Sequence, residues 1–165
     1  MAKLILTKLK EGFADSITDV SEFRDQLTCV VKKDNLPVIC GFLRDDPELS
    51  FNFLSCICGV DFLGRNPRFD VVYELYSISK NHRVRLKVQV NENESVPSVT
   101  PIWSTANWHE REIFDLFGIT FDDHPDLRRI LLPDNFEGHP LRKDFSLTRE
   151  EVMFSHNLNR PPKIE

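Results

Sequence analysis

The first apolar pattern with helical spacing lies shortly before Pro47. Four residues at positions i, i+3, i+4 and i+7 would form one face of a helix: Leu36, Ile39, Cys40 and Leu43. Asp34 or Asn35 is placed to cap this helix, and Pro37 suits its first turn, where an N–H has no helical partner anyway. We therefore expect a short amphipathic helix that ends before Pro47.

A second short helix is predicted directly after the first. Ser50 can serve as its N-cap, and Phe53, Leu54 and Ile57 would share one side of it. Gly59 would end the helix, because glycine readily adopts the left-handed conformation that commonly follows a last helical turn.

Three other segments have strand character. Residues 68–79 are rich in β-branched and aromatic types, residues 83–90 alternate apolar with polar positions, and residues 28–31 form a shorter candidate. Residues 80–82 are short enough for a hairpin loop, so the two strands beside them should be antiparallel neighbours. Because a one-sided sheet needs polar residues on its open face, we expect one row to face water: Arg83, Arg85, Lys87 and Gln89.

Residues 106–117 predict a third helix, which Thr105 can cap and Gly118 can end. Its buried stripe is expected to comprise Ile113, Leu116 and Phe117. The charged residues take the other positions, where they should face water or a partner: Glu110, Arg111, Glu112 and Asp115. Arg111 and Asp115 have the i, i+4 spacing of a helical ion pair.

Residues 124–145 repeat one phrase, as HPDLRR from His124 and as HPLRK from His139. Their prolines rule out a long helix, and apolar residues are interspersed among balanced charges. Proline confines the preceding histidine to extended backbone, and arginine forks suit planar carboxylates, so the segment is predicted to be a stiff strap. The spacing of these residues does not decide where the strap lies. It can lie over the chain's own core or across a partner.

The predicted fold class is α+β: a mixed β-sheet with helices packed on one face, plus an extended C-terminal arm. We assign residues 1–118 to the domain and residues 119–165 to the arm and tail. A chain of 165 residues that is 41% hydrophobic suits a single core. Its net charge of −5 argues against a nucleic-acid surface, which needs clustered cations. No apolar run approaches the ~20 residues of a membrane helix, and the first residues lack the apolar core of a signal peptide.

The histidine, glutamate and cysteine residues do not match the ligand spacing of known metal sites. His109 and Glu112 resemble part of a zinc-protease helix, but position 113 is isoleucine where a second histidine is needed. A metal-dependent hydrolase using these two and His124 or His139 is one alternative function. Cys56 and Cys58 would point about 200° apart on the predicted second helix, so we interpret them as structural thiols.

Two stretches carry a family resemblance: WHEREIFDLFGI at 108–119 and HPDLRRILLPDNFEGHPLRKDF at 124–145. They resemble the C-type subunit, also called the 30 kDa subunit, of the proton-pumping NADH:quinone oxidoreductase, respiratory complex I. The order of the preceding segments, with GVDF at 59–62, is similar as well. Three positions depart from the family pattern: Leu116 stands where methionine is common, Asp123 where glycine is frequent, and Ser146 where proline is common.

The resemblance implies a non-catalytic structural protein of the peripheral arm, bound on the cytoplasmic side of the cell inner membrane through the complex. Such proteins hold no cofactor or metal; FMN and iron-sulfur clusters, which carry electrons from NADH to quinone with proton translocation, lie in partner subunits. The expected partners are the D-type subunit, which carries the quinone site and would be a separate chain, and other peripheral-arm subunits. A related membrane-bound hydrogenase or another donor-linked dehydrogenase is the nearest alternative assembly.

The resemblance favours the strap across a partner. The residues expected at the interface are Trp108, Glu110, Arg111, Glu112, Asp115, His124, Pro125, Leu127, Arg128, Arg129, Phe136, His139, Pro140, Leu141, Arg142, Lys143, Asp144 and Phe145.

Overall fold

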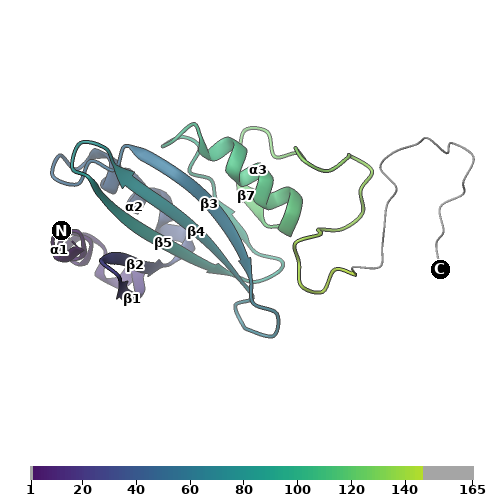
Figure 1. The fold of residues 1–165 in the computed structure, drawn as a ribbon, viewed down its shortest axis with the longest axis horizontal. Helices are drawn as coiled ribbons and strands as arrows, with labels where there is room; N and C mark the ends of the chain where they lie inside the picture. Colours follow the sequence, from purple (N-terminus) through teal and green to yellow (C-terminus); the bar gives the residue numbers. More distant parts are fainter. Residues whose placement is uncertain (1, 147–165) are drawn as a thin grey trace, which may run out of the picture.

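A mixed five-stranded sheet forms the centre of the molecule in the computed structural model, which describes residues 2–146 (Figure 1). The strand order is β1-β2-β5-β4-β3, and the β2–β5 pair is parallel while the other pairs are antiparallel. The strands are β1 (Ile17–Phe23), β2 (Gln26–Val31), β3 (Phe53–Asp61), β4 (Phe69–Ser77) and β5 (His82–Val90). This arrangement confirms the predicted α+β class.

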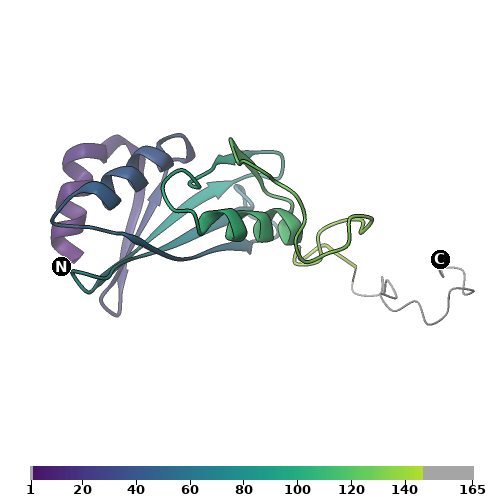
Figure 2. The ribbon, with the colours of Figure 1, turned by 90° about the horizontal axis from the view of Figure 1, so that it is seen from above.

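Three helices accompany the sheet: α1 (Ala2–Phe13), α2 (Leu36–Asp45) and α3 (Ala106–Phe117). Helices α1 and α2 lie together at one end of the molecule, whereas α3 lies alongside β3 at the other end (Figures 1 and 2). The remaining elements are the short turns η1 (Ala14–Ser16) and η2 (Lys33–Asn35) and a small parallel pair, β6 (Ser95–Pro97) with β7 (Thr120–Asp122). No helix within residues 2–146 has the length and apolar composition needed to cross a membrane.

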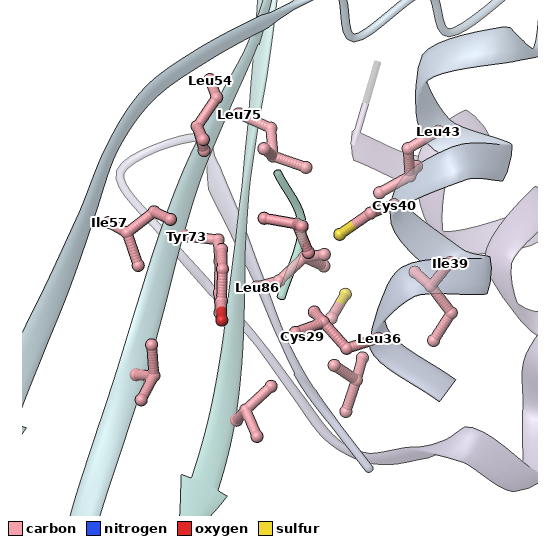
Figure 3. Close-up of a cluster of buried hydrophobic side chains, with 14 of the residues drawn as sticks. Cys29, Leu36, Ile39, Cys40, Leu43, Leu54, Ile57, Tyr73, Leu75 and Leu86 are labelled. Atoms are coloured by element: carbon pink, nitrogen blue, oxygen red, sulfur yellow. The ribbon is translucent and has the colours of Figure 1, made fainter. Parts of the chain in front are cut away.

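The core lies between the helices and one face of the sheet (Figure 3). The predicted face of α2 is confirmed, because all four of its residues are fully buried: Leu36, Ile39, Cys40 and Leu43. Helix α1, which sequence analysis did not predict, adds Ile5 and Leu9 to the same cluster. Asn35 precedes α2 but does not cap it, since its amide donates to Ser16 Oγ at 2.6 Å.

The predicted second helix is wrong, because residues 53–61 form strand β3. Leu54 and Ile57 are both buried although they are three residues apart, which is the spacing of a helical face. A β-bulge between Leu54 and Cys56 produces this spacing, since one extra residue interrupts the alternation of the strand. Gly59 pairs with Val71 on β4 rather than ending a helix.

The other strand predictions are confirmed. Strands β4 and β5 form the expected antiparallel hairpin, and Asn81 in its loop adopts a left-handed φ of 51° that suits a tight turn. The predicted outward row is only partly open to water: Arg83 and Gln89 are exposed, whereas Arg85 is half-buried and pairs with Glu74 on β4.

The bounds predicted for α3 are confirmed, and two residues after it turn the chain back. Gly118 has a φ of 72° and ends the helix as expected, while Thr105 makes no side-chain cap. Asp123 has a φ of 58°, a left-handed conformation that aspartate tolerates better than most residues. Between them, β7 joins the first residues after Gly118 to the domain. The division at residue 118 stays a prediction, and the tail beyond Ser146 lies outside the described residues.

Gly59 is required by the packing of α3 on β3. A Cβ at this position would lie 2.8 Å from Cδ2 of Phe117 and 3.3 Å from its Cγ. We expect Gly59→Ala to lower the free energy of unfolding by about 1–3 kcal/mol, because the ring has to move within a packed site. Denaturant unfolding measures this change. Gly59→Ala combined with Phe117→Leu should recover part of the loss, and a full-size loss in the double variant would contradict this explanation.

Candidate functional site

The second His-Pro phrase closes the C-terminal end of α3. A helix leaves its last carbonyls without helical partners, and the turn at Gly118 satisfies only that of Phe114. The phrase supplies donors to the next three: Asp115 O accepts from His139 Nδ1 at 2.9 Å, Leu116 O from the Leu141 N–H at 3.1 Å, and Phe117 O from Arg142 Nε. Burial and the nearby arginines keep the pKa of His139 below its ordinary value, so its ring stays neutral. This phrase therefore acts as a helix cap.

A single carboxylate fixes the path of the loop between the two phrases. Asp115 is fully buried, and its Oδ2 accepts from three consecutive backbone N–H groups, those of Ile130, Leu131 and Leu132, at 2.8–3.1 Å. Its Oδ1 accepts from Arg129 at 2.8 Å. Burial alone would raise the pKa of Asp115, but these four hydrogen bonds hold it below the ordinary value. The group therefore stays ionised in the folded protein.

The first His-Pro phrase attaches the loop to the beginning of α3. His124 Nε2 lies 3.3 Å from the carbonyl of Asn107, and Nδ1 accepts from the Asp126 N–H at 3.1 Å. These partners place the ring proton on Nε2. Arg111 is also buried and donates to two successive carbonyls of the loop, those of Arg128 and Arg129.

Glu110 is a buried carboxyl whose hydrogen bonds come from outside its helix. Its Oε2 accepts from Ser98 Oγ at 2.7 Å, and its Oε1 accepts from the Val99 N–H at 2.8 Å. The Nε2 atom of His124 is 3.9 Å away. Burial raises the pKa of Glu110 to about 7, against the opposing effect of the Ser98 and Val99 hydrogen bonds.

The end of the strap is attached to the sheet by Arg68. Its guanidinium binds Asp61 through two hydrogen bonds of 2.7 and 2.8 Å, and Asp144 through two of 2.8 and 3.0 Å. The Lys143 N–H also donates to Asp61. Arg68 lowers the pKa of both carboxyls. Neither Arg68 nor Asp61 was predicted as a site residue; the available signal was Asp61, a charged residue on the buried side of β3 at its end.

Two predictions for α3 are wrong. Glu110, Arg111 and Asp115 are buried, although we expected them to face water or a partner. Arg111 and Asp115 do not form the predicted ion pair, because Asp115 binds Arg129 and Arg111 binds loop carbonyls. Of the predicted stripe, Ile113 is buried, while Leu116 and Phe117 are half-buried. The error arises because the partners of these charges come from the loop, which helical periodicity does not describe.

The predicted interface residues thus fall into three groups. Eight make contacts within the chain: Glu110, Arg111, Asp115, His124, Arg129, His139, Arg142 and Asp144. Leu127, Phe136, Pro140 and Phe145 are half-buried, and the rings of Phe136 and Phe145 stack at 6.0 Å. The other six are exposed, as is Asp144 of the first group: Trp108, Glu112, Pro125, Arg128, Leu141 and Lys143. Whether they contact a partner stays a prediction.

The metal-dependent hydrolase finds no supporting geometry in the described part of the chain. No group of three or more His, Cys, Asp and Glu side chains in residues 2–146 is arranged to hold a metal ion. Both ring nitrogens of His124 have backbone partners, and His139 Nδ1 is hydrogen-bonded to the Asp115 carbonyl of α3.

Adjacent arginines give a matched test of the Asp115 contact. Arg129→Ala leaves a buried carboxylate without its cation and should lower the free energy of unfolding by about 2–4 kcal/mol. Arg128 is exposed and pairs only with exposed Asp126, so Arg128→Ala should change it by about 0.5 kcal/mol or less. Chemical denaturation of the two variants measures the difference. Equal losses would show that Asp115 does not hold the loop.

Glu110 should make stability fall as pH rises towards neutrality. Its folded pKa lies above the ordinary value of 4.5, so between about pH 5 and 7 the folded protein retains a proton that the unfolded chain has released. The loss should be on the order of 2–3 kcal/mol, complete above pH 8. Glu110→Gln should remove this fall and leave only the opposite, smaller effect of His139, whereas Glu112→Gln, at an exposed position of the same helix, should keep the fall. Denaturant unfolding at a series of pH values checks both, and a slope unchanged by Glu110→Gln would exclude this origin.

Comparisons with known proteins agree with the sequence resemblance. The family model described as "Respiratory-chain NADH dehydrogenase, 30 Kd subunit" matches residues 29–151. The C-type subunit of NADH-quinone oxidoreductase from Roseiflexus sp. (strain RS-1) is 53% identical over 157 residues, which cover 94% of this chain and 90% of that protein. The protein of the same name from Geotalea uraniireducens (strain Rf4) is 50% identical over 141 residues, or 85% of each chain.

The fold also matches a solved structure. A chain of the membrane-bound sulfane sulfur reductase (MBS), an archaeal respiratory membrane complex, superimposes with a TM-score of 0.72 over 88% of this chain and 86% of that one. At 23% sequence identity this likeness concerns the fold alone. Because the family model covers residues 29–151 and the relatives are about half identical over most of their length, the chain belongs to the family of the 30 kDa subunit of respiratory-chain NADH dehydrogenase.

Proposed function

We propose that the chain is a non-catalytic structural member of the peripheral arm of an NADH:quinone oxidoreductase, where it braces the quinone-site (D-type) subunit. In this role electrons pass from NADH through FMN and iron-sulfur clusters of partner subunits to quinone, coupled to proton translocation. The chain holds no cofactor and is bound peripherally at the cytoplasmic side of the cell inner membrane through its partners. The names of the relatives, which are C-type subunits of NADH-quinone oxidoreductase, support this assembly over a related hydrogenase.

One observation carries the proposal: the α3 end of the molecule buries three charged residues, Glu110, Arg111 and Asp115, and leaves three large apolar side chains exposed. Trp108 is 63% exposed, Leu131 58% and Leu141 52%. The loop that presents two of them is held in place by Asp115 and by the carbonyls of α3. Burying such side chains against another protein would be favourable by roughly 1.5–3 kcal/mol each.

The rigid attachment of this loop favours a bracing role. A surface that is ordered before binding loses little conformational freedom when it binds, so more of the contact energy remains as affinity. Arg111 stacks over the Trp108 ring at 5.3 Å and limits its rotation. Arg128 and Lys143 are exposed beside these anchors and can meet carboxylates of a partner.

The test removes the apolar anchors without touching the contacts that hold the loop. In cells that assemble the complex, Trp108→Ala, Leu131→Ala and Leu141→Ala together should lower co-purification of the quinone-site subunit at least tenfold, since truncating a tryptophan anchor costs about 2 kcal/mol or more. The matched control is Phe23→Ala with Ile78→Ala, which removes exposed apolar side chains at a strand end and a turn outside this region.

The control should co-purify normally, and all variants should unfold cooperatively as isolated chains. Normal recovery of the quinone-site subunit with the triple variant would refute the proposed surface. An equal loss with the control would show that general exposure of apolar groups, rather than this surface, governs recovery.

A further inference from the structure

Two thiols lie together on the open face of the sheet, outside the surface used above. Cys56 and Cys58 are two residues apart on β3, and strand geometry directs both to the same face. Their Sγ atoms are 3.7 Å apart. Cys58 is exposed and Cys56 is half-buried, whereas Cys29 and Cys40 are buried in the core. The expectation that Cys56 and Cys58 point apart was wrong because it assumed a helix.

The separation of the two sulfurs fits a shared ligand better than a disulfide. Two thiolates bound to one tetrahedral zinc ion, with bonds of about 2.3 Å, lie roughly 3.8 Å apart, and a larger soft ion requires a somewhat wider separation. A disulfide instead needs its sulfurs at about 2.05 Å and Cα atoms no more than about 6.8 Å apart, which residues i and i+2 of an extended strand barely satisfy. A bridging ion can therefore enter with little movement of the strand.

A carboxylate and an arginine lie beside the thiols and compensate each other's charge. Glu74 on β4 is the direct cross-strand neighbour of Cys56, and it holds a fixed position through Arg85 and through Gln26 at 2.9 Å. Burial, followed by the hydrogen bond to Cys58, raises the pKa of Cys56 to about 11. The Cys56 thiol is therefore a poor nucleophile, and a cation that binds it has to displace its proton.

The chemical class of the ion follows from the small number of ligands. No third His, Cys, Asp or Glu side chain in residues 2–146 completes a metal site here. Structural zinc sites use four protein ligands, so zinc should bind weakly to this pair. Soft ions form stronger bonds to thiolate sulfur than zinc does, so two protein thiolates should hold them more tightly.

We propose that Cys56 and Cys58 form a two-thiolate binding site for a soft, thiophilic cation of the class of Cd²⁺. Binding converts two thiols and one divalent ion into a dithiolate complex and releases two protons to solvent. Water completes the coordination on the open side. The site is independent of the proposed bracing function, because none of its residues belongs to α3 or to the strap.

Cadmium titration of the purified full-length chain tests the proposal. With a phosphine reductant, which keeps the thiols reduced without competing as a thiol, equilibrium dialysis should find one tight Cd²⁺ per chain, with thiolate-to-metal charge-transfer absorbance. Cys58→Ser, at an exposed position, should weaken binding at least 100-fold, and Cys56→Ser should do the same. Affinity should rise with pH, because protons are displaced.

Moving the two cysteines along β3 tests whether two thiols on one face of the strand are sufficient to bind the ion. Cys56→Ser combined with Val60→Cys shifts the two thiols along β3 while keeping them on one face, since Val60 is the next outward residue after Cys58. This variant should bind Cd²⁺ within about tenfold of the wild type, given that ligand type and count are unchanged. Wild-type binding no tighter than that of Cys58→Ser, or no recovery in the folded displaced pair, would overturn the proposal.

Discussion

The buried carboxylate of Asp115 is the constraint on which the α3 end of the molecule depends. A negative charge near the C-terminal end of a helix opposes the helix dipole, and full burial removes its hydration as well. Such a group is tolerated only with several good donors, and here three consecutive N–H groups and Arg129 provide them. Because three successive N–H groups can converge on one oxygen in few backbone conformations, the carboxylate selects the path of the loop.

The two His-Pro phrases extend this constraint along the helix. The phrase at His124 attaches the strap near the beginning of α3, and the phrase at His139 satisfies the carbonyls at its end. Arg68 then fixes the last residues to the edge of the sheet. Proline before each turn reduces the freedom of the unfolded chain, so ordering the strap opposes folding less than its length suggests. The strap is therefore attached to α3 and to the sheet by contacts within the chain.

The elements that could be predicted from the sequence are those that a local pattern of apolar and polar residues determines. Helix α2 and the β4–β5 hairpin follow from unbroken periodicity, and the bounds of α3 follow from Gly118. Strand β3 was missed because its bulge imitates helical spacing. The burial of Glu110, Arg111 and Asp115 was missed because the partners of their side chains lie 11 to 18 residues away along the chain, as with Val99 and Arg129, and no periodic rule reaches across a loop.

The sequence left two alternative positions for the strap, over the chain's own core or across a partner. In the structure these two positions do not exclude each other. A loop that merely covered its own domain would bury its leucines and leave its charges in water, since burying an ion without a partner is costly. Here the polar groups of Asp115, Arg129 and His139 are directed inward, while Leu131 and Leu141 remain more than half exposed. This arrangement uses hydrogen bonds for attachment and leaves apolar area exposed. The two positions are therefore compatible: polar groups fasten the strap to α3, while Leu131 and Leu141 remain accessible for the partner contact proposed above.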